Sequence, residues 1–210
     1  MQLRLLSVNI AKPKIIGTLH GEAIFSAIAK KPVTDRVFVG INGIEGDQVA
    51  DPSVHGGPDK AVYAYPAGNW AWWESEHGIA CAPATFGENL TLQGADEDGI
   101  RIGDRFQWGD CVLEVAQPRG PCFKLAIHTG NPRAPQIMTL SGRVGWYCRV
   151  VREGLSGTTI ARIATSDAPS VREAFFARHA PHAPRELAAR VYATPALAEN
   201  WREGVAKRLA

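Results

Sequence analysis

Short runs of β-branched and aliphatic residues, separated by Gly, Pro, Asn and Asp, extend over the first 165 residues and constrain the fold more than any other feature. Runs of this kind predict strands that end at turns. Their spacing is irregular, and the clearest helix among them spans residues 66–77, with Trp70 and Trp73 facing inward. The predicted class is therefore mainly β, a barrel or folded sheet rather than a parallel α/β sheet. The predicted strands are residues 3–8, 33–41, 61–65, 99–102, 111–116, 146–151 and 158–163.

Residues 166–210 have a helical pattern instead. Ser166 or Asp167 is predicted to cap a first helix, with Pro169 in its first turn. Two prolines end this helix, a second short one follows, and a third is predicted to begin at Thr194. We therefore expect two domains, a β barrel at residues 1–165 and a small three-helix extension at residues 166–210. The apolar positions of the third helix are Leu197, Trp201, Val205 and Leu209.

The composition narrows the possible partners and location. Hydrophobic residues make up 45% of the chain and charged residues 21%, as in ordinary globular proteins. A net charge of +2 with scattered acids argues against nucleic-acid binding. No apolar run has the length of roughly 20 residues that a membrane span needs, and the start is too weakly apolar for a signal peptide. We expect a cytoplasmic protein with no membrane partner.

Cys122 lies in a loop that two prolines make stiff. Pro118 and Pro121 fix φ and remove two backbone donors, so this loop can hold a side chain in one direction. Arg119 and Lys124 flank the thiol in sequence, and nearby cations favour a thiolate, which is the nucleophilic and metal-ligating form. Cys122 is therefore a candidate nucleophile or metal ligand, and Arg119 is the cation that would favour its thiolate. From this local context alone, a buried structural thiol is an equal alternative for Cys122, and it is the favoured role of the other three cysteines.

A second candidate site is the loop His55-Gly56-Gly57, followed by Lys60. The glycines expose backbone N–H groups beside an imidazole, and Lys60 adds a positive charge, a combination that suits an anion such as phosphate. The loop contains neither a P-loop nor a dinucleotide-binding fingerprint. The simpler interpretation is an ordinary polar loop.

Two isolated side chains complete the candidate set. Asn89 follows a turn at residues 86–88 and carries both a donor and an acceptor for a polar ligand, although a turn-forming role is the simpler interpretation. Lys31 precedes the strand predicted at residues 33–41, and the alternative for it is a solvated charge.

Taken together and in this order, these segments resemble the YiiM-type branch of the MOSC superfamily, which is named for the C-terminal domain of molybdenum cofactor sulfurase. The resemblance covers about residues 26–125, and the helical tail is similar to the C-terminal extension of the same branch. The matching segments are Ser26 to Val33, Gly46-Asp47, His55-Gly56-Gly57-Pro58-Asp59-Lys60-Ala61, Phe86-Gly87-Glu88-Asn89-Leu90, Ile102-Gly103-Asp104 and Gln117-Pro118-Arg119-Gly120-Pro121-Cys122.

The resemblance implies a MOSC-type β-barrel-like fold that binds the molybdenum cofactor (molybdopterin), a pterin with a dithiolene and a terminal phosphate. Cys122 is the implied metal ligand, since a soft thiolate suits a molybdenum already bound by sulfur. Because the cofactor is anionic, its implied binding residues are cations and hydrogen-bond donors. At the level of the family alone, the resemblance also implies pyridoxal phosphate binding. The implied cofactor-binding residues are His55, Gly56, Gly57, Lys60, Asn89 and Arg119.

YiiM-type relatives reduce N-hydroxylated compounds, including hydroxylaminopurines, so the resemblance implies a molybdenum-dependent oxidoreductase. The implied reaction is R–NHOH plus two electrons and two protons giving R–NH2 and water. Lys31 or Arg119 would stabilise negative charge on the departing oxygen, and His55 would deliver a proton. The cysteines are too few and wrongly spaced for an iron–sulfur domain, so a separate reductase is expected to supply electrons. The terminal helices could dock that reductase, join a second subunit in a homodimer, or pack as a lid.

Three alternatives stay open at this point. The first is a non-catalytic carrier or sulfur-transfer protein that binds the cofactor. The second is a hydrolase in which His55 activates Cys122 as a nucleophile. The third is a DNA-binding module at residues 167–210, which seven Lys or Arg against five Asp or Glu make the weakest of the three.

Overall fold

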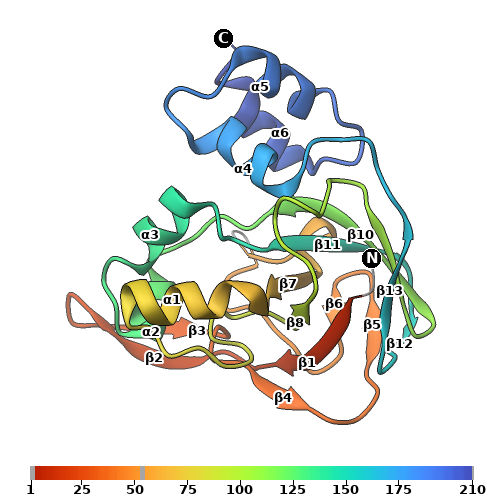
Figure 1. The fold of residues 1–210 in the computed structure, drawn as a ribbon. Helices are drawn as coiled ribbons and strands as arrows, with labels where there is room; N and C mark the ends of the chain where they lie inside the picture. Colours follow the sequence, from red (N-terminus) through yellow and green to blue (C-terminus); the bar gives the residue numbers. More distant parts are fainter. Residues whose placement is uncertain (1–2, 53–54, 210) are drawn as a thin grey trace.

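A curled eight-stranded sheet forms the centre of the structure, a computed structural model that describes residues 3–52 and 55–209 (Figure 1). Neighbouring strands run antiparallel, except that β7 and β8 are parallel. This arrangement confirms the predicted class, a mainly β, barrel-like fold. The spatial order is β13 (Ile160–Ala164), β9 (Arg105–Trp108), β10 (Cys111–Pro118), β11 (Trp146–Arg152), β7 (Val62–Pro66), β8 (Leu90–Gln93), β1 (Arg4–Ile10) and β4 (Lys31–Val33).

Smaller elements surround this sheet. A hairpin joins β2 (Lys14–Leu19) to β3 (Glu22–Ser26), and a second small sheet contains β12 (Gly154–Leu155), β5 (Phe38–Gly40) and β6 (Gly43–Ile44). The α-helices are α1 (Trp70–His77), α2 (Lys124–Thr129), α3 (Ala134–Ser141), α4 (Val171–His179), α5 (Arg185–Tyr192) and α6 (Glu199–Ala206). The 3-10 turns are η1 (Pro58–Lys60) and η2 (Ala67–Asn69). Within the described residues, no helix is long and apolar enough to cross a bilayer.

Strand β10 connects the core of the sheet to the loop that carries Cys122. All of its residues are buried, because β9 and β11 pair with its two edges and α4 packs against it. Its run of Val, Leu and Ala side chains, with few polar interruptions, is typical of such a strand. The chain leaves β10 at Pro118, so the loop of residues 119–122 starts from a rigid support.

The C-terminal helices pack over one end of the sheet, near β10 and β11, and their apolar side chains join the same core (Figure 1). The predicted cap of the first helix is wrong: Ser170, not Ser166 or Asp167, caps α4. The Ser170 hydroxyl accepts a hydrogen bond from the Glu173 N–H, and the Glu173 carboxylate accepts one from the Ser170 N–H. Ser166 is held outside the helix, because its N–H donates to Asp104.

The third helix also starts later than predicted, at Glu199 rather than after Thr194. The Thr194 hydroxyl donates to the Arg190 carbonyl at the end of α5, and the Ala198 N–H donates to the Ala116 carbonyl of β10. This bond to the sheet keeps Ala198 extended, so the helix cannot begin before it. The division into domains at residues 165 and 166 stays a prediction.

Two predicted strands differ from the structure. Residues 99–102 form a turn with one isolated bridge, because Asp96 and Asp104 accept local backbone hydrogen bonds there. Residues 33–41 form parts of two strands, β4 and β5, which belong to different sheets. The other predicted strands are present with shifted ends. Strands β2, β3, β6, β8, β9 and β12 and helices α2 and α3 were not predicted.

Candidate functional site

A cavity of about 610 Å³ opens where the loops after β3, β6 and β10 meet. This volume lies within the range of small-molecule sites. The cavity brings together seven of the eight site residues predicted from the sequence, although they come from distant segments. These seven are His55, Gly56, Gly57, Lys60, Asn89, Arg119 and Cys122.

Lys31 is the exception. Its side chain is exposed on β4, where it pairs with Ile10 of β1, and it does not line the cavity. The lysine that lines the cavity is its neighbour Lys30, whose side chain is only 8% exposed. Consecutive side chains of an extended segment point in opposite directions, so two adjacent lysines cannot both face one site.

Lys30 and Asp47 form a buried ion pair in the cavity wall. The Lys30 Nζ lies 2.5 and 2.6 Å from the two carboxylate oxygens of Asp47, which also accepts a hydrogen bond from the Ala11 N–H. Burial lowers the pKa of Lys30, and the charge and hydrogen bonds of Asp47 oppose this shift. Asp47 therefore holds a desolvated ammonium against the cavity.

Asn89 is held in this network by hydrogen bonds within the protein, and its predicted role in binding a ligand stays a prediction. Its Oδ1 accepts from the Tyr63 N–H at 3.0 Å, and its Nδ2 donates to the Asn9 carbonyl and to Asp47 Oδ2. The side chain is buried and both amide hydrogens are used. Asn89 lines the cavity but has little bonding capacity left for a ligand, and its contacts fix Asp47 instead.

The loop of residues 55–57 carries an imidazole on a backbone that favours glycine. Gly56 and Gly57 have φ values of 95° and 84°, in the left-handed region that other residues rarely adopt. The pKa of His55 lies below 6.5, because burial and the positive charges of Lys124, Lys60 and Arg119 disfavour the imidazolium. Without a ligand His55 is therefore neutral at pH 7, and donating a proton would require an anion beside it.

Arg119 is a buried cation without an acidic partner. The residue is 5% exposed, and no salt bridge links it to an Asp or Glu within residues 3–52 and 55–209. Its Nη1 lies 2.9 Å from the Met138 sulfur, and its guanidinium lies 5.2 Å from the ring centroid of Tyr63. Because buried charges are normally paired, this arrangement favours an anionic ligand in the cavity.

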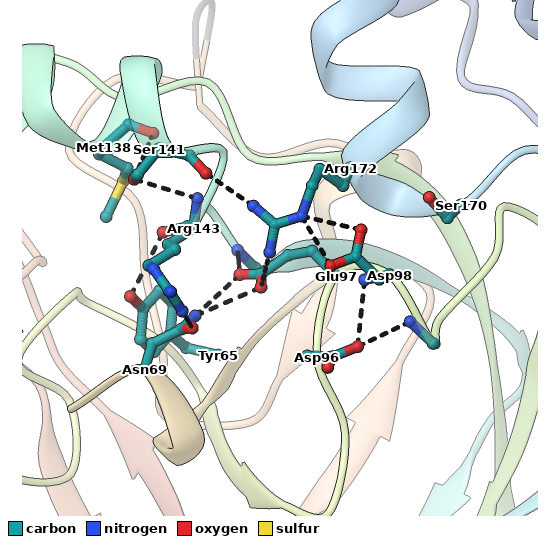
Figure 2. Close-up of polar contacts among 12 residues, drawn as sticks. Tyr65, Asn69, Asp96, Glu97, Asp98, Met138, Ser141, Arg143, Ser170 and Arg172 are labelled. Atoms are coloured by element: carbon teal, nitrogen blue, oxygen red, sulfur yellow. Dashed lines mark hydrogen bonds and ion pairs between the residues drawn. The ribbon is translucent and has the colours of Figure 1, made fainter. Parts of the chain in front are cut away.

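A second buried network, centred on Glu97, is hydrogen-bonded through Gly145 to the loop that carries Arg119. The Glu97 carboxylate is fully buried and accepts hydrogen bonds from the Gly145 N–H at 2.9 Å and from the Asn69 amide at 3.0 Å, and Arg172 approaches its other oxygen (Figure 2). The Gly145 carbonyl in turn accepts a hydrogen bond from the Arg119 N–H. Glu97 therefore fixes the backbone of the loop that carries the site arginine.

Cys122 differs from the other cysteines in its position. It lines the cavity and is half-buried, and its carbonyl accepts a hydrogen bond from Leu125 at the start of α2. Burial raises the pKa of Cys81 to about 12 and that of Cys111 to about 11, and it also raises the pKa of Cys148. These three line no part of the cavity and stay protonated at neutral pH.

A hydrolase with Cys122 as its nucleophile would need a hydrogen bond between His55 and the Cys122 thiol. No hydrogen bond joins His55 to Cys122 in the part of the chain that the structure describes. His55 is influenced instead by the surrounding cations and by Asp51. This geometry disfavours a nucleophile activated by His55.

Several functional candidates were missed by sequence reasoning. Lys30, Asp47, Tyr63 and Tyr147 all line the cavity. Asp47 lies in a segment that the sequence singles out, but nothing local indicates its pairing with Lys30. Tyr63 and Tyr147 lie in strands whose sequence pattern predicts only residues of the hydrophobic core.

The fold and the site together define a class: a curled, barrel-like sheet with a cation-lined cavity around one loop cysteine. The chain belongs to the MOSC domain family, whose sequence profile matches residues 51–167. It is a MOSC protein of the YiiM type.

Known relatives support this assignment over most of the chain. The uncharacterized protein YflK of Bacillus subtilis is 35% identical over 97% of this chain and 93% of its own. Protein YiiM of Escherichia coli is 41% identical over 61% of this chain and 59% of its own. The crystal structure of YiiM from Geobacillus stearothermophilus is 31% identical with a TM-score of 0.82, covering 99% of this chain and all of that one.

Proposed function

We propose that this protein is a molybdenum-cofactor-dependent reductase of N-hydroxylated compounds, with Cys122 as the ligand of the metal. The observation that carries this proposal is the buried Arg119 guanidinium, which lies without an acidic partner in the cavity that Cys122 also lines. A buried guanidinium of this kind favours a ligand that brings negative charge.

The residues present fit the molybdenum cofactor. Arg119, Lys60 and Lys124 supply positive charge for an anionic pterin and its phosphate, and the glycines at 56 and 57 supply backbone N–H groups. Within the described residues, no cluster of three or more His, Cys, Asp or Glu side chains could hold a metal by itself. One thiolate from Cys122 therefore matches a metal whose other sulfur ligands come with the cofactor. When bound, the cofactor supplies the two-electron chemistry that removes the substrate oxygen.

Lys30 has the role that was expected of Lys31 or Arg119. Its desolvated ammonium, held by Asp47, stabilises negative charge that develops on the substrate oxygen. His55 holds or delivers a proton once an anion beside it favours the imidazolium. In a reducing compartment such as the cytoplasm, Cys122 stays available as a thiol.

One relative supports the reductase assignment and a separate electron donor. A protein named "Reductase" from Gibberella moniliformis is 38% identical over 69% of this chain, and the match covers 27% of that longer protein. We propose that the electrons for this shorter chain come from a separate reductase.

Turnover of a hydroxylaminopurine by the protein from a cofactor-competent host, with an artificial electron donor, tests the proposal. We expect formation of the aminopurine, and loss of that activity in Arg119→Met. A protein that contains the cofactor but forms no amine with any donor is a carrier, and that result would overturn the reductase assignment.

A further inference from the structure

Arg149 of β11 joins three parts of the molecule, one of which is the turn that carries the cavity residue Lys60. Its Nε donates to Asp59 Oδ1 at 2.7 Å, and its Nη1 donates to Glu114 Oε1 at 2.8 Å and to the Ala196 carbonyl at 2.9 Å. The side chain is 24% exposed. Arg149 therefore links the turn η1, the core strand β10 and the segment that leads into α6.

The turn that Arg149 holds carries a cavity residue. Asp59 lies between Pro58 and Lys60, and the Lys60 N–H donates to the Gly57 carbonyl. Lys60 lines the cavity, while Asp59 pairs with Arg149 outside it. Burial and the charge of Arg178 lower the pKa of Lys60, and the charge of Asp59 opposes them. Asp59 and Lys60 are neighbours in the same short turn, so whatever fixes Asp59 also fixes the backbone of Lys60.

We propose that Arg149 is a positioning residue for the anion-binding end of the cavity. It fixes η1 by holding Asp59, and it compensates a carboxylate whose charge would otherwise repel an incoming phosphate. The Ala196 carbonyl orients Arg149, so the C-terminal helices contribute to the site through this side chain. This inference rests on the proposed function, because it concerns the end of the cavity that would take the cofactor phosphate.

Phosphate affinity in matched variants of the full chain tests the inference. Inorganic phosphate is the probe, and its binding is measured by titration calorimetry. In Arg149→Gln the Asp59 charge is uncompensated, and we expect affinity to fall by about fivefold. In the double variant Arg149→Gln, Asp59→Asn that charge is gone, and we expect most of the affinity to return.

Arg105→Gln is the control, because Arg105 binds the other oxygen of Glu114 at 2.6 Å and does not contact η1. It should bind phosphate like the wild type. Wild-type affinity in Arg149→Gln, or no recovery in the double variant although it unfolds like the wild type, would overturn the inference.

A measurement without ligand separates this inference from the proposed function. If the wild type binds no phosphate, the anion site of the proposed function is wrong. The backbone amide resonances of Gly57 and Lys60 then decide the role of Arg149. Because Arg149 holds Asp59 of η1, these resonances should move in Arg149→Gln and stay in place in Arg105→Gln. Unmoved resonances in Arg149→Gln would show that Arg149 does not fix the turn.

Discussion

The Lys30 ammonium binds both carboxylate oxygens of Asp47, at 2.5 and 2.6 Å, in the wall of a cavity that also contains Cys122. This pair holds a cation at the site, and it ties the segment before β4 to the loop after β6. Asn89 completes the arrangement by donating to Asp47 Oδ2 at 2.8 Å. Three segments that are distant in sequence are fixed around one charge pair.

Replacing Lys30 should cost far more stability than replacing Lys31. Lys30→Met leaves the buried Asp47 carboxylate without its cation, and we expect the free energy of unfolding to fall by about 3 kcal/mol. Lys31→Met is the matched control, and because Lys31 is exposed its effect should stay within about 0.5 kcal/mol. Denaturant unfolding measures both. Equal losses in the two variants would mean that the pair is not formed.

Glu97 should be essential for the loop that carries Arg119. Glu97→Ala leaves the Gly145 N–H and the Asn69 amide without their buried acceptor, and we expect a loss of about 3 kcal/mol. The control is Asp98→Ala, which removes the other acidic partner of Arg172. The Asp98 side chain is 64% exposed, so its loss should cost less than about 1 kcal/mol. Thermal or denaturant unfolding of both variants gives the comparison, and a larger effect at Asp98 would contradict this account.

The class of fold could be predicted from the sequence, and seven of the eight predicted site residues line one cavity, while the errors have physical causes. Short strands and stiff loops leave local signals, so the sheet and the loops at Cys122 and His55 could be predicted. Which of the two adjacent lysines points into the cavity depends on the orientation of the chain at β4. The local sequence around Lys30 and Lys31 does not indicate that orientation. The start of α6 depends on a bond between residues far apart in sequence, Ala198 to Ala116. The start of α4 is set by the local capping box of Ser170 and Glu173, a sequence signal that the prediction of Ser166 or Asp167 overlooked.

The His55 imidazole should titrate below 6.5 in the ligand-free protein and higher with inorganic phosphate, because a bound anion offsets the cations around it. The unfolded chain then binds more protons than the folded protein between the folded-state pKa and 6.5. Stability due to His55 is therefore present above pH 6.5 and is lost as the pH falls through that window.

NMR titration of His55 with and without phosphate checks this prediction, and His55→Gln identifies the signal. The difference in unfolding free energy between wild type and His55→Gln should shrink as the pH falls below 6.5. A His55 pKa above 6.5 without phosphate, or no response to phosphate, would show that the cavity does not concentrate positive charge at this residue.

The central claim is that Cys122 holds the metal of a molybdenum cofactor. Its most direct test is the molybdenum and pterin content of protein purified from a cofactor-competent host, compared among wild type, Cys122→Ser and the control Cys81→Ser. Cys81 is half-buried and does not line the cavity. We predict molybdenum in the wild type and in Cys81→Ser, and its loss in Cys122→Ser. Molybdenum content that is unchanged in Cys122→Ser would contradict the account.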